Sequence, residues 1–503
     1  MYPFEINAGG KYYSACEKHR IMGPASVYHF NRAVGGTAEK KIKKINTEKF
    51  HVYIFTKKDG DIIFIGEKAE NLLSMLNKAG YKAYVVGGCV RDMLMGKECD
   101  DIDITTSATP RQCEEVLKEN SVKYIETGLK HGTVTAVIDG ETFEITTFRT
   151  EGGYADSRHP DSVTFVSDVR EDLARRDFTI NAIAYNHEEG IVDPYCGEDD
   201  IKRKIIRAVG DPYRRFEEDA LRIMRGVRFA SVLGFALDEK TKEAALENRE
   251  NLSRISGERL YSELKKMLLG DFVFEALDEY KEIIGTVIEP LKDTFDCVQY
   301  NPWHIYDVYT HIAKSVELAP KDVDLRLVML LHDIGKPFCK TTDCNMVDHF
   351  YGHPEISKEL AEKVLKRLKV SRSTMERVLL LIELHDRHIH ANEPSIGYWL
   401  SRIGKERTFD LIDVKTADLA SHNLDMTQSE IEELHETKEM LRSMIERGVP
   451  QSVNDLAVNG RDIMKAGFSG KEIGEAQEWL LTKVYEGLPN KKDDLLNALK
   501  NKK

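Results

Sequence analysis

Two aspartates separated by one residue, Asp101 and Asp103 in the segment "DIDITT", have the types and spacing needed for metal-dependent chemistry. Side chains on a strand alternate between its faces, so we expect both carboxylates to point the same way while Ile102 and Ile104 face a core. Such a pair can hold two Mg²⁺ ions roughly 3.5–4 Å apart, where one ion activates an attacking hydroxyl and the other neutralises a leaving pyrophosphate. An acidic surface turn is the alternative, because Asp-x-Asp alone is a weak signal.

A glycine pair precedes these aspartates in the segment "VVGGCVRD". Gly87 and Gly88 would let backbone N–H groups approach a triphosphate closely, and Arg91 would add positive charge there. A third carboxylate, Glu144, lies in the otherwise apolar segment "TFEITTF" and is a candidate third metal ligand. Together these residues predict a magnesium site beside a phosphate-binding turn.

A second set of candidate metal ligands is rich in histidine. The segments "VYTHIAKS", "LLHDIGKP" and "KTADLAS" supply His311, His332, Asp333 and Asp418. Adjacent His and Asp after an apolar helix are hard to bury without a partner, which favours a divalent metal. Histidines bonded within ordinary helices are the alternative. Three further histidines are candidate additional ligands: His349, His353 and His385.

The elements that must position these residues follow from the apolar pattern. Short apolar runs from "KAYVVGG" to "SVTFV" predict strands, whereas "EKAENLLSMLNKAG" and "TPRQCEEVLKEN" predict helices, the second opened by Thr109 and Pro110. After "RRDFTINAIAYN" the pattern is helical to the end. We therefore predict an α+β multidomain chain with these parts: an extension of open role at 1–65, a mixed α/β head at 66–190, and all-helical segments at 191–285, 300–425 and 430–503.

Composition limits the class of protein. The 503 residues carry a formal net charge of −13, and no apolar run approaches the roughly 18 residues that a membrane helix needs. The first residues do not read as a secretion signal, so we expect a cytoplasmic protein with no membrane partner. Eight scattered cysteines without a C-x-x-C pair predict reduced thiols. Between residues 202 and 228, nine Lys and Arg against four acids form a basic segment that could steer a polyanion.

Five segments in order resemble the class II tRNA nucleotidyltransferases, which are the CCA-adding enzymes, and the related bacterial poly(A) polymerases: "GGCVRD", "DIDITT", "RRDFTINAIAYN", "DPYCGEDDI" and "EDALRIMRGVRFA". The resemblance implies a polymerase-β-like head, a helical neck, an HD-type body and a tRNA-binding tail. It also implies template-independent addition of CCA from CTP and ATP to the 3′ end of tRNA, with Mg²⁺. A-only addition, poly(A) synthesis and an HD-type phosphohydrolase remain alternatives, and the oligomeric state stays open.

The resemblance also implies roles for single residues. Asp101 and Asp103 would be metal ligands, and Gly87, Gly88 and Arg91 would contact phosphates. The candidate nucleotide-binding residues lie in the third and fifth segments: Arg175, Arg176, Asp177, Asn181, Asp219, Arg222, Arg225 and Arg228. In the HD phosphohydrolase superfamily, residues in the order of His311, His332, Asp333 and Asp418 surround a divalent metal.

Base choice is expected to rest on Asp219 and Arg222 of "EDALR". At positions i and i+3 they would lie on one helix face, where the carboxylate accepts from the amino group shared by C and A while the guanidinium donates to the ring nitrogen. A surface ion pair worth about 0.2–0.5 kcal/mol is the alternative. The Gly-containing segment "RTEGGYADSRHPDSVTFV" resembles the family's flexible loop, in which Asp156 and Arg158 would contact the region of the incoming base.

Overall fold

The computed structural model describes residues 4–7, 12–15, 43–47, 50–56, 62–99, 101–128, 132–152 and 162–502. The chain forms two compact units. The first, the head unit, comprises Met1–Arg149, Phe165–Leu173 and Ile183–Pro194, and the second, the helical unit, comprises Thr150–Thr164, Ala174–Ala182 and Tyr195–Lys503. No helix among the described residues is both long and apolar enough to span a bilayer.

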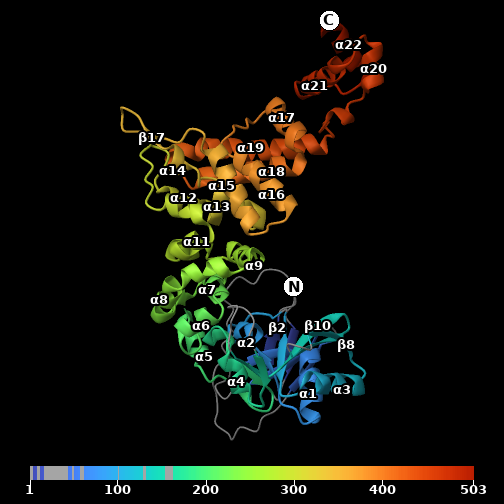
Figure 1. The fold of residues 1–503 in the computed structure, drawn as a ribbon. Helices are drawn as coiled ribbons and strands as arrows, with labels where there is room; N and C mark the ends of the chain where they lie inside the picture. The colour runs from blue at the N-terminus through green and yellow to red at the C-terminus, as the bar shows by residue number, and fades with distance from the viewer. Residues whose placement is uncertain are drawn as a thin grey trace. The chain divides into compact units, whose positions relative to one another are not determined.

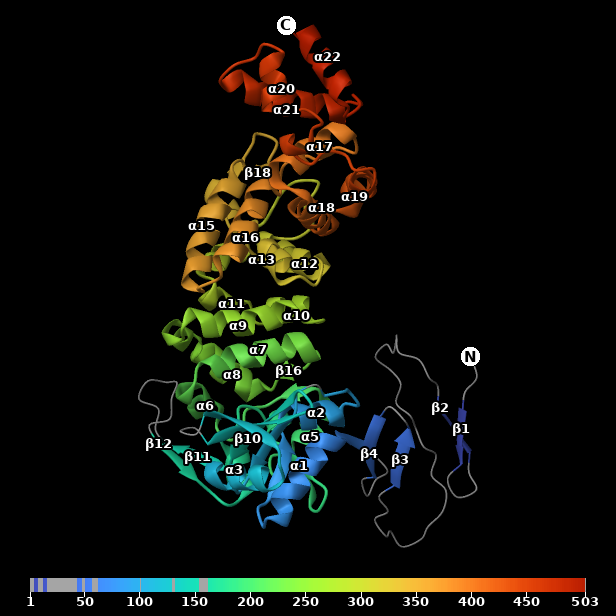
Figure 2. The ribbon, with the colours of Figure 1, turned by 90° about the vertical axis from the view of Figure 1, so that its right-hand side faces the viewer.

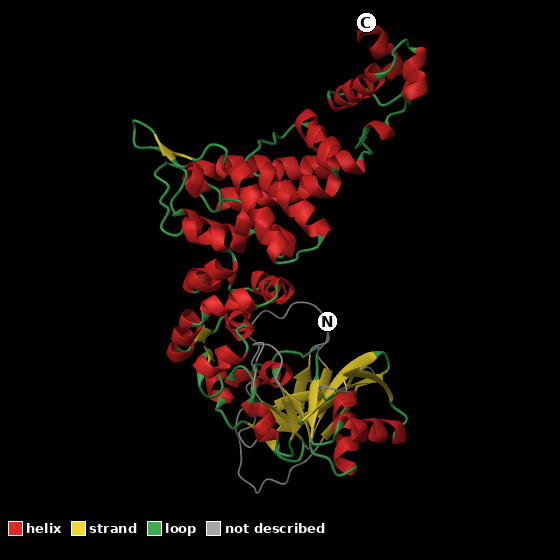
Figure 3. Cartoon of the chain, viewed as in Figure 1, coloured by secondary structure: helices red, strands yellow, loops and turns green. Residues whose placement is uncertain are grey.

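The head unit is built on a seven-stranded mixed sheet, whose strands are yellow in Figure 3. Only β7 and β10 are parallel; their neighbours in the sheet pair antiparallel. In spatial order the strands are β14 (Gly190–Val192), β13 (Ala184–Asn186), β6 (Ala83–Val86), β7 (Asp103–Thr106), β10 (Glu141–Thr147), β9 (Thr133–Ile138) and β8 (Lys123–Gly128). This arrangement brings β6 and β10 to either side of β7, so the glycine pair after β6 and the acid on β10 flank the strand that begins at Asp103.

The helices of the head unit follow from local sequence features. Helix α1 (Glu67–Lys78) buries Leu72, Leu73 and Leu76, and α3 (Pro110–Glu119) starts at a Thr109 capping box with Pro110 at its first position, which confirms the predicted start. The other helices here are α2 (Gly88–Leu94) and α4 (Val169–Ala174).

Further strands form small sheets. Strands β4 (Phe50–Thr56) and β5 (Ile62–Gly66) pair antiparallel with β3 (Lys43–Thr47) beside β4. Two more small sheets are pairs, β1 (Phe4–Asn7) with β2 (Tyr12–Ala15) and β11 (Arg149–Gly152) with β12 (Ser162–Phe165).

The neck of the helical unit is not wholly helical. A short parallel pair, β15 (Ile205–Ile206) with β16 (Ala236–Leu237), corrects the all-helical expectation, and two residues per strand are too few for sequence periodicity to reveal. Figure 2 shows the surrounding helices: α5 (Gly197–Arg203), α6 (Pro212–Glu218), α7 (Leu221–Leu233), α8 (Glu239–Glu247), α9 (Gly257–Leu268), α10 (Val273–Glu279) and α11 (Lys281–Val287). Gly270 permits close packing on α7, because a Cβ there would lie 2.1 Å from Ser231 Oγ.

The body and tail are helical except for a hairpin of β17 (Thr341–Thr342) and β18 (Asp348–His349). Helices α12, α13, α15, α16 and α18 pack together around apolar residues of α13 that are fully buried (Figure 1). The body helices are α12 (Val308–Leu318), α13 (Val323–Leu331), α14 (Lys336–Cys339), α15 (His353–Arg367), α16 (Arg372–Leu384), α17 (Glu393–Ile403), α18 (Lys405–Ala420) and α19 (Leu424–Glu446). The tail has α20 (Gly460–Lys465), α21 (Lys471–Tyr485) and α22 (Lys492–Lys502), and 3₁₀ turns cover 179–181, 249–254, 289–294 and 453–455.

Candidate functional site

Two of the three predicted carboxylates lie on neighbouring parallel strands. Asp103 is the first residue of β7, and Glu144 of β10 is its direct partner in the register. Both side chains are exposed, whereas the next pair along, Ile104 and Ile145, is buried. Asp103 and Ile104 follow the alternation expected from the sequence, although Thr105 and Thr106 further along β7 are both buried. The pairing leaves two carboxylates on one face of the sheet.

Asp101 departs from its prediction. It lies in an exposed bend before β7, so the expectation that it sits on the strand beside Asp103 is wrong. Among the described residues, two groups of three ligand atoms lie mutually within 4.8 Å, and neither contains a head carboxylate. The donor chemistry nevertheless suits Mg²⁺, which prefers carboxylate oxygens and keeps several waters in exposed sites.

The glycine turn joins β6 to α2. Gly87 has φ 77°, a left-handed conformation that disfavours a side chain, and α2 begins at Gly88. Arg91 on this helix is buried, and its Nε and Nη2 donate to the Asp92 carboxylate at 3.0 Å each. Arg91 is therefore held in place by Asp92, and its contact with phosphates stays a prediction.

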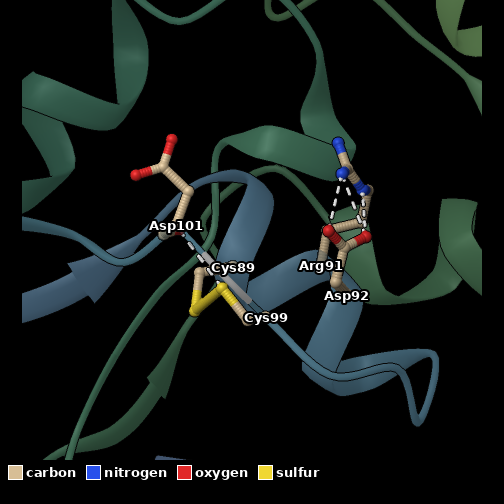
Figure 4. Close-up of a disulfide and its surroundings, with 5 residues drawn as sticks. All are labelled: Cys89, Arg91, Asp92, Cys99 and Asp101. Atoms are coloured by element: carbon tan, nitrogen blue, oxygen red, sulfur yellow. Dashed lines mark hydrogen bonds and ion pairs between the residues drawn. A yellow bond between two sulfur atoms is a disulfide. The ribbon is translucent and has the colours of Figure 1, made fainter. Parts of the chain in front are cut away.

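Two cysteines next to these residues are not reduced thiols, which corrects the expectation for all eight. Cys89 and Cys99 form a disulfide with a Cα–Cα distance of 5.3 Å (Figure 4). The chain leaves α2 at Leu94 and reverses at Gly96, which has φ 72°, and this turn returns Cys99 to the start of the helix. The five other cysteines in the described part of the chain are free.

In the helical unit, Asp177 is the centre of a buried network. Its Oδ1 accepts from the backbone N–H of Phe178 and from Asn181, and its Oδ2 accepts from Arg225 Nε at 2.7 Å. Burial would raise the pKa of Asp177, but Arg225 and these hydrogen bonds hold the pKa of that carboxyl well below its usual range. Asp177 thus orders Asn181 and Arg225, two other predicted nucleotide-binding residues.

Asp219 and Arg222 do not share a helix face. Helix α6 ends at Glu218 and α7 begins at Leu221, and Asp219 between them is extended at φ −148°. Asp219 accepts from Leu221 N at 3.0 Å and from Arg259 Nη2 at 2.7 Å. The expectation of an i, i+3 pair on one helix is therefore wrong.

Arg222 is fixed by its own partners. Its Nη1 donates to Glu218 Oε2 at 2.6 Å and to the carbonyl of Arg215, and its Nη2 donates to the carbonyl of Arg175 at 3.1 Å. Sequence reasoning missed Glu218, whose position four residues before Arg222 was the available signal.

Many basic side chains between residues 202 and 228 form ion pairs within the neck. This weakens the prediction that the segment is a surface that steers a polyanion. Arg228 Nε lies 2.6 Å from Oε2 of the buried Glu263, and Arg228 Cζ lies 3.9 Å from the centre of the Phe229 ring. Arg175 and Arg176 are half-buried just after α4. Six of the nine basic side chains form ion pairs with acids of the helical unit: Lys202, Arg207, Arg215, Arg222, Arg225 and Arg228. Asp156 and Arg158 lie outside the described residues.

The HD residues come together in the body. His311 Nε2 lies 3.2 Å from His332 Nε2, 3.2 Å from Asp333 Oδ2 and 3.1 Å from Asp418 Oδ1. Asp333 is 1% exposed, and neither oxygen of its carboxylate makes a hydrogen bond. All four predicted residues therefore lie within bonding distance of one small volume.

Two more histidines complete a second side of this cluster. His353 Nε2 lies 3.2 Å from Asp333 Oδ1 and 3.1 Å from His385 Nε2. His349 does not join, because it lies on the β18 hairpin and contacts Asp343 at 3.1 Å. Lys336, which sequence reasoning missed, pairs with Asp333 at 2.6 Å and stands three residues after it.

The ring orientation of the four clustered histidines suits metal binding. Each Nδ1 contacts an oxygen of the protein at 2.7–2.9 Å, which directs Nε2 toward Asp333. These oxygens belong to Met329, Phe350, Ile382 and Ser421. Facing Nε2 atoms about 3 Å apart would bring lone pairs together, and a cation between them relieves that repulsion. The residues therefore fit a divalent metal.

Three family descriptions match consecutive parts of the chain. "Poly A polymerase head domain" matches residues 83–207, "Probable RNA and SrmB- binding site of polymerase A" matches 234–282, and "HD domain" matches 303–438. The first covers the glycine turn and the carboxylates, and the third covers the histidine cluster.

Curated relatives of this chain are named CCA-adding enzyme. A CCA-adding enzyme of Pediococcus pentosaceus is 45% identical over 273 residues, 51% of this chain and 66% of the relative. One of Lactobacillus helveticus is 55% identical over 203 residues, 40% of this chain and 50% of the relative. The chain thus spans about half to two thirds of the length of the curated relatives it matches.

Solved structures extend the likeness over most of the chain. The Bacillus stearothermophilus CCA-adding enzyme in complex with CTP has a TM-score of 0.64 at 29% identity and covers 87% of this chain and 97% of its own. The Thermotoga maritima CCA-adding enzyme complexed with tRNA has a TM-score of 0.57 at 20% identity, and the match covers 87% of this chain and 96% of that enzyme. At this low identity the likeness shows only that the fold is shared. A head with carboxylates beside a glycine turn, a helical neck and an HD body, matched in this order, place the chain in the family of CCA-adding tRNA nucleotidyltransferases and bacterial poly(A) polymerases with an HD domain.

Proposed function

We propose that this protein adds CCA to the 3′ end of tRNA from CTP and ATP without a template, in the cytoplasm. The observation that carries the proposal is the register that sets Asp103 beside Glu144, on a strand that is paired on its other side with the strand leading into Gly87 and Gly88. In this turn the Gly87 N–H donates to the carbonyl of Ile183 at 3.1 Å, and Gly88 is the first residue of α2. A carboxylate set beside such a glycine turn suits transfer of a nucleotidyl group from a triphosphate. The names of the relatives agree with it.

In the reaction, the 3′-hydroxyl of the RNA attacks the α-phosphate of the nucleotide and pyrophosphate leaves. Asp101, Asp103 and Glu144 would hold Mg²⁺, which supplies activation of the hydroxyl and neutralisation of the leaving charge when bound. The Gly88 N–H would orient the triphosphate, while the Gly87 N–H holds the turn by donating to the carbonyl of Ile183. Arg91, fixed by Asp92, adds charge there. The head residues thus position the triphosphate and neutralise its charge. The reaction requires no covalent intermediate with the protein.

Base selection rests, in this proposal, on Asp219 and Arg222 held rigidly by their partners. C and A both offer an amino group beside a ring acceptor, whereas U and G offer a carbonyl beside N–H. Each Asp219 oxygen already accepts one bond and has a further lone pair for an amino group. Three bonds fix the Arg222 plane, so its guanidinium can present donors without losing side-chain entropy on binding.

The binding of tRNA falls to the neck and tail in this proposal. Arg175, Arg176, Asp177, Asn181, Arg225 and Arg228 are assigned to the nucleotide, some directly and others, such as Asp177, by ordering their neighbours. The loop residues Asp156 and Arg158 are assigned to the region of the incoming base. We propose the domain ranges 1–65, 66–190, 191–285, 300–425 and 430–503 for this division of labour.

The test is nucleotide addition to tRNA that lacks its terminus and to tRNA ending in CC, with labelled CTP and ATP offered separately. We expect CTP on the first substrate and ATP on the second. Asp103→Ala should be inactive, and Glu141→Gln, an exposed acid on the same strand as Glu144, should match the parent. Use of ATP alone would identify A-only addition, long A tails on unrelated RNA would identify a poly(A) polymerase, and no incorporation would refute the proposal.

A second function is favoured by the histidine cluster. We propose that the body binds a divalent metal through His311, His332, Asp333 and Asp418, with His353 and His385 on the second side, and hydrolyses phosphate esters. Metal-dependent release of phosphate or nitrophenol from nitrophenyl phosphate esters tests it. Release that persists in the His332→Ala, Asp333→Ala double variant would refute the assignment.

A further inference from the structure

The Cys89–Cys99 disulfide joins the two segments that carry the proposed chemistry of the head. Cys89 directly follows Gly88, and Cys99 stands two residues before Asp101. Cys99 Sγ lies 3.2 Å from the carbonyl oxygen of Asp101. A covalent bond here therefore fixes the backbone around Asp101 to the start of the helix that follows the phosphate turn.

In the structure with the Cys89–Cys99 disulfide formed, the three proposed metal ligands of the head do not lie together. Asp101 lies in a bend outside β7, and in Figure 4 its carboxylate points away from the two sulfur atoms. Within the described parts of the chain, Asp101, Asp103 and Glu144 are not a group of ligand atoms within 4.8 Å of one another. Extension of β7 by two residues would carry Asp101 onto the face of Asp103, but the tether at Cys99 restrains that movement.

We propose that Cys89 and Cys99 are a reversible oxidation site whose disulfide suppresses nucleotide addition by holding Asp101 off β7. This inference rests on the proposed function of the head. The two thiols supply the chemistry, and a low-molecular-weight disulfide such as oxidised glutathione is the oxidant. The site therefore responds to the thiol–disulfide balance around the protein.

The exchange balances as two displacements. Cys99 is half-exposed and Cys89 is 5% exposed, so the Cys99 thiolate attacks the small disulfide first and one small thiolate leaves. The Cys89 thiolate then attacks Cys99 Sγ, the protein disulfide forms, and the second small thiolate leaves. The protons of the two cysteine thiols end on the two released thiols, and excess small thiol reverses both steps.

The experiment compares the full-length protein after equilibration with dithiothreitol and with oxidised glutathione, with the disulfide mapped by mass spectrometry of unreduced peptides. We expect the addition rate to be lower in the oxidised protein by roughly 10- to 100-fold, since misplacing a reacting group by about 1 Å can cost about 10²-fold. Dithiothreitol should restore it. Cys99→Ser should keep the reduced rate in both conditions, and Cys344→Ser, which removes an exposed free cysteine, should respond like the parent.

A second readout needs no substrate. Amide hydrogen exchange over residues 95–106 should speed up on reduction in the parent and be insensitive in Cys99→Ser. An unchanged addition rate with the disulfide mapped, no disulfide between these residues under oxidation, or equal inhibition of Cys99→Ser would each overturn the inference. Absence of addition in both states would instead refute the proposed function of the head, while the exchange data would still report whether the tether restrains Asp101.

Discussion

Glu144 lies directly opposite Asp103 in the parallel pairing of β10 with β7. Residues paired in this way point to the same face of a sheet, and here both are exposed while Ile104 and Ile145 beside them are buried. The fold therefore places Glu144, whose neighbours along β10 face the core, next to the proposed metal ligand Asp103.

The first prediction concerns Glu144→Gln, which keeps the shape of the side chain and removes its charge. If Glu144 is a metal ligand, addition should fall by at least about 10²-fold, the scale seen when one electrostatic group is lost from an active site. Retention of tRNA in a filter-binding assay should be unaffected. A rate equal to that of the Glu141→Gln control would remove Glu144 from the ligand set.

The second prediction concerns base choice. Asp219→Ala removes the acceptor for the amino group of C and A, so preference over UTP should weaken. A hydrogen bond to a charged group is worth about 1.5–3 kcal/mol, so relative use of UTP should rise by roughly ten- to hundredfold. Single-nucleotide extension with each of the four triphosphates measures it, and Mg²⁺ dependence should stay the same.

Arg259→Lys provides the comparison for that experiment, because Arg259 donates to Asp219 without being assigned to the base. It should reduce the rate with the correct nucleotide and preserve the order of preference. Unaltered preference in folded Asp219→Ala and Arg222→Ala proteins would return both residues to a structural role in the neck.

The third prediction concerns the metal of the body. A ligand that binds only the folded state at 100 times its dissociation constant adds about 2.7 kcal/mol to stability. Mn²⁺ should therefore raise the unfolding temperature of the parent, and chelation should reverse the change. The His332→Ala, Asp333→Ala variant should show no such shift, yet its CCA addition should be intact, because the head carboxylates belong to a different unit. Loss of addition in the folded double variant would show that the two sites depend on each other.

The fourth prediction concerns Asp177→Asn and pH. Removing one partner of a buried ion pair costs about 3–5 kcal/mol, and because the Arg225 side chain is a third exposed we expect about 3 kcal/mol or less. The pKa of Asp177 is lowered in the folded protein, so its stabilisation is complete above the unfolded pKa of about 3.9 and is lost as pH falls through the folded value.

The loss of stability should accordingly be constant between pH 8 and about pH 5 and shrink in stronger acid. Urea unfolding followed by circular dichroism measures it. Asp199→Asn, which removes an exposed acid on α5, should change stability by less than about 0.5 kcal/mol. A cost for Asp177→Asn that grew as pH fell would contradict the assigned direction of the pKa.

The sequence predicted those features that local chemistry encodes. Thr109 and Pro110 open α3, and Ile104 turns inward beside Asp103, because a capping box and a strand period are properties of a few neighbouring residues. It failed at Asp219, where a helix break occurs between two helical segments without Gly or Pro to mark it. The cysteine pair was equally hidden, since its bond depends on how the turn at Gly96 returns the chain.

The histidines show the same limit at longer range. His349 and His353 are four residues apart and of one type, yet only His353 faces Asp333, because a hairpin ends and α15 begins between them. Which histidine joins the cluster is thus decided by tertiary packing. The family motif identified the first four residues. Of the three further candidates named from the sequence, the structure brings His353, at the start of α15, and His385, directly after α16, to Asp333.

The body's cluster also limits where this chain could be cut without loss of structure. His311 takes its Nδ1 partner, Ser421, from 110 residues further along, and Asp418 stands three residues before that serine. A fragment that stopped before α18 would leave His311, His332 and the buried Asp333 facing a gap filled by solvent. Proteolytic trimming before Asp418 should therefore destroy the cluster. Trimming just after Ser421 would also remove α19, which packs on α18 and buries Ile431, Leu434 and Leu441, so the body must extend through α19.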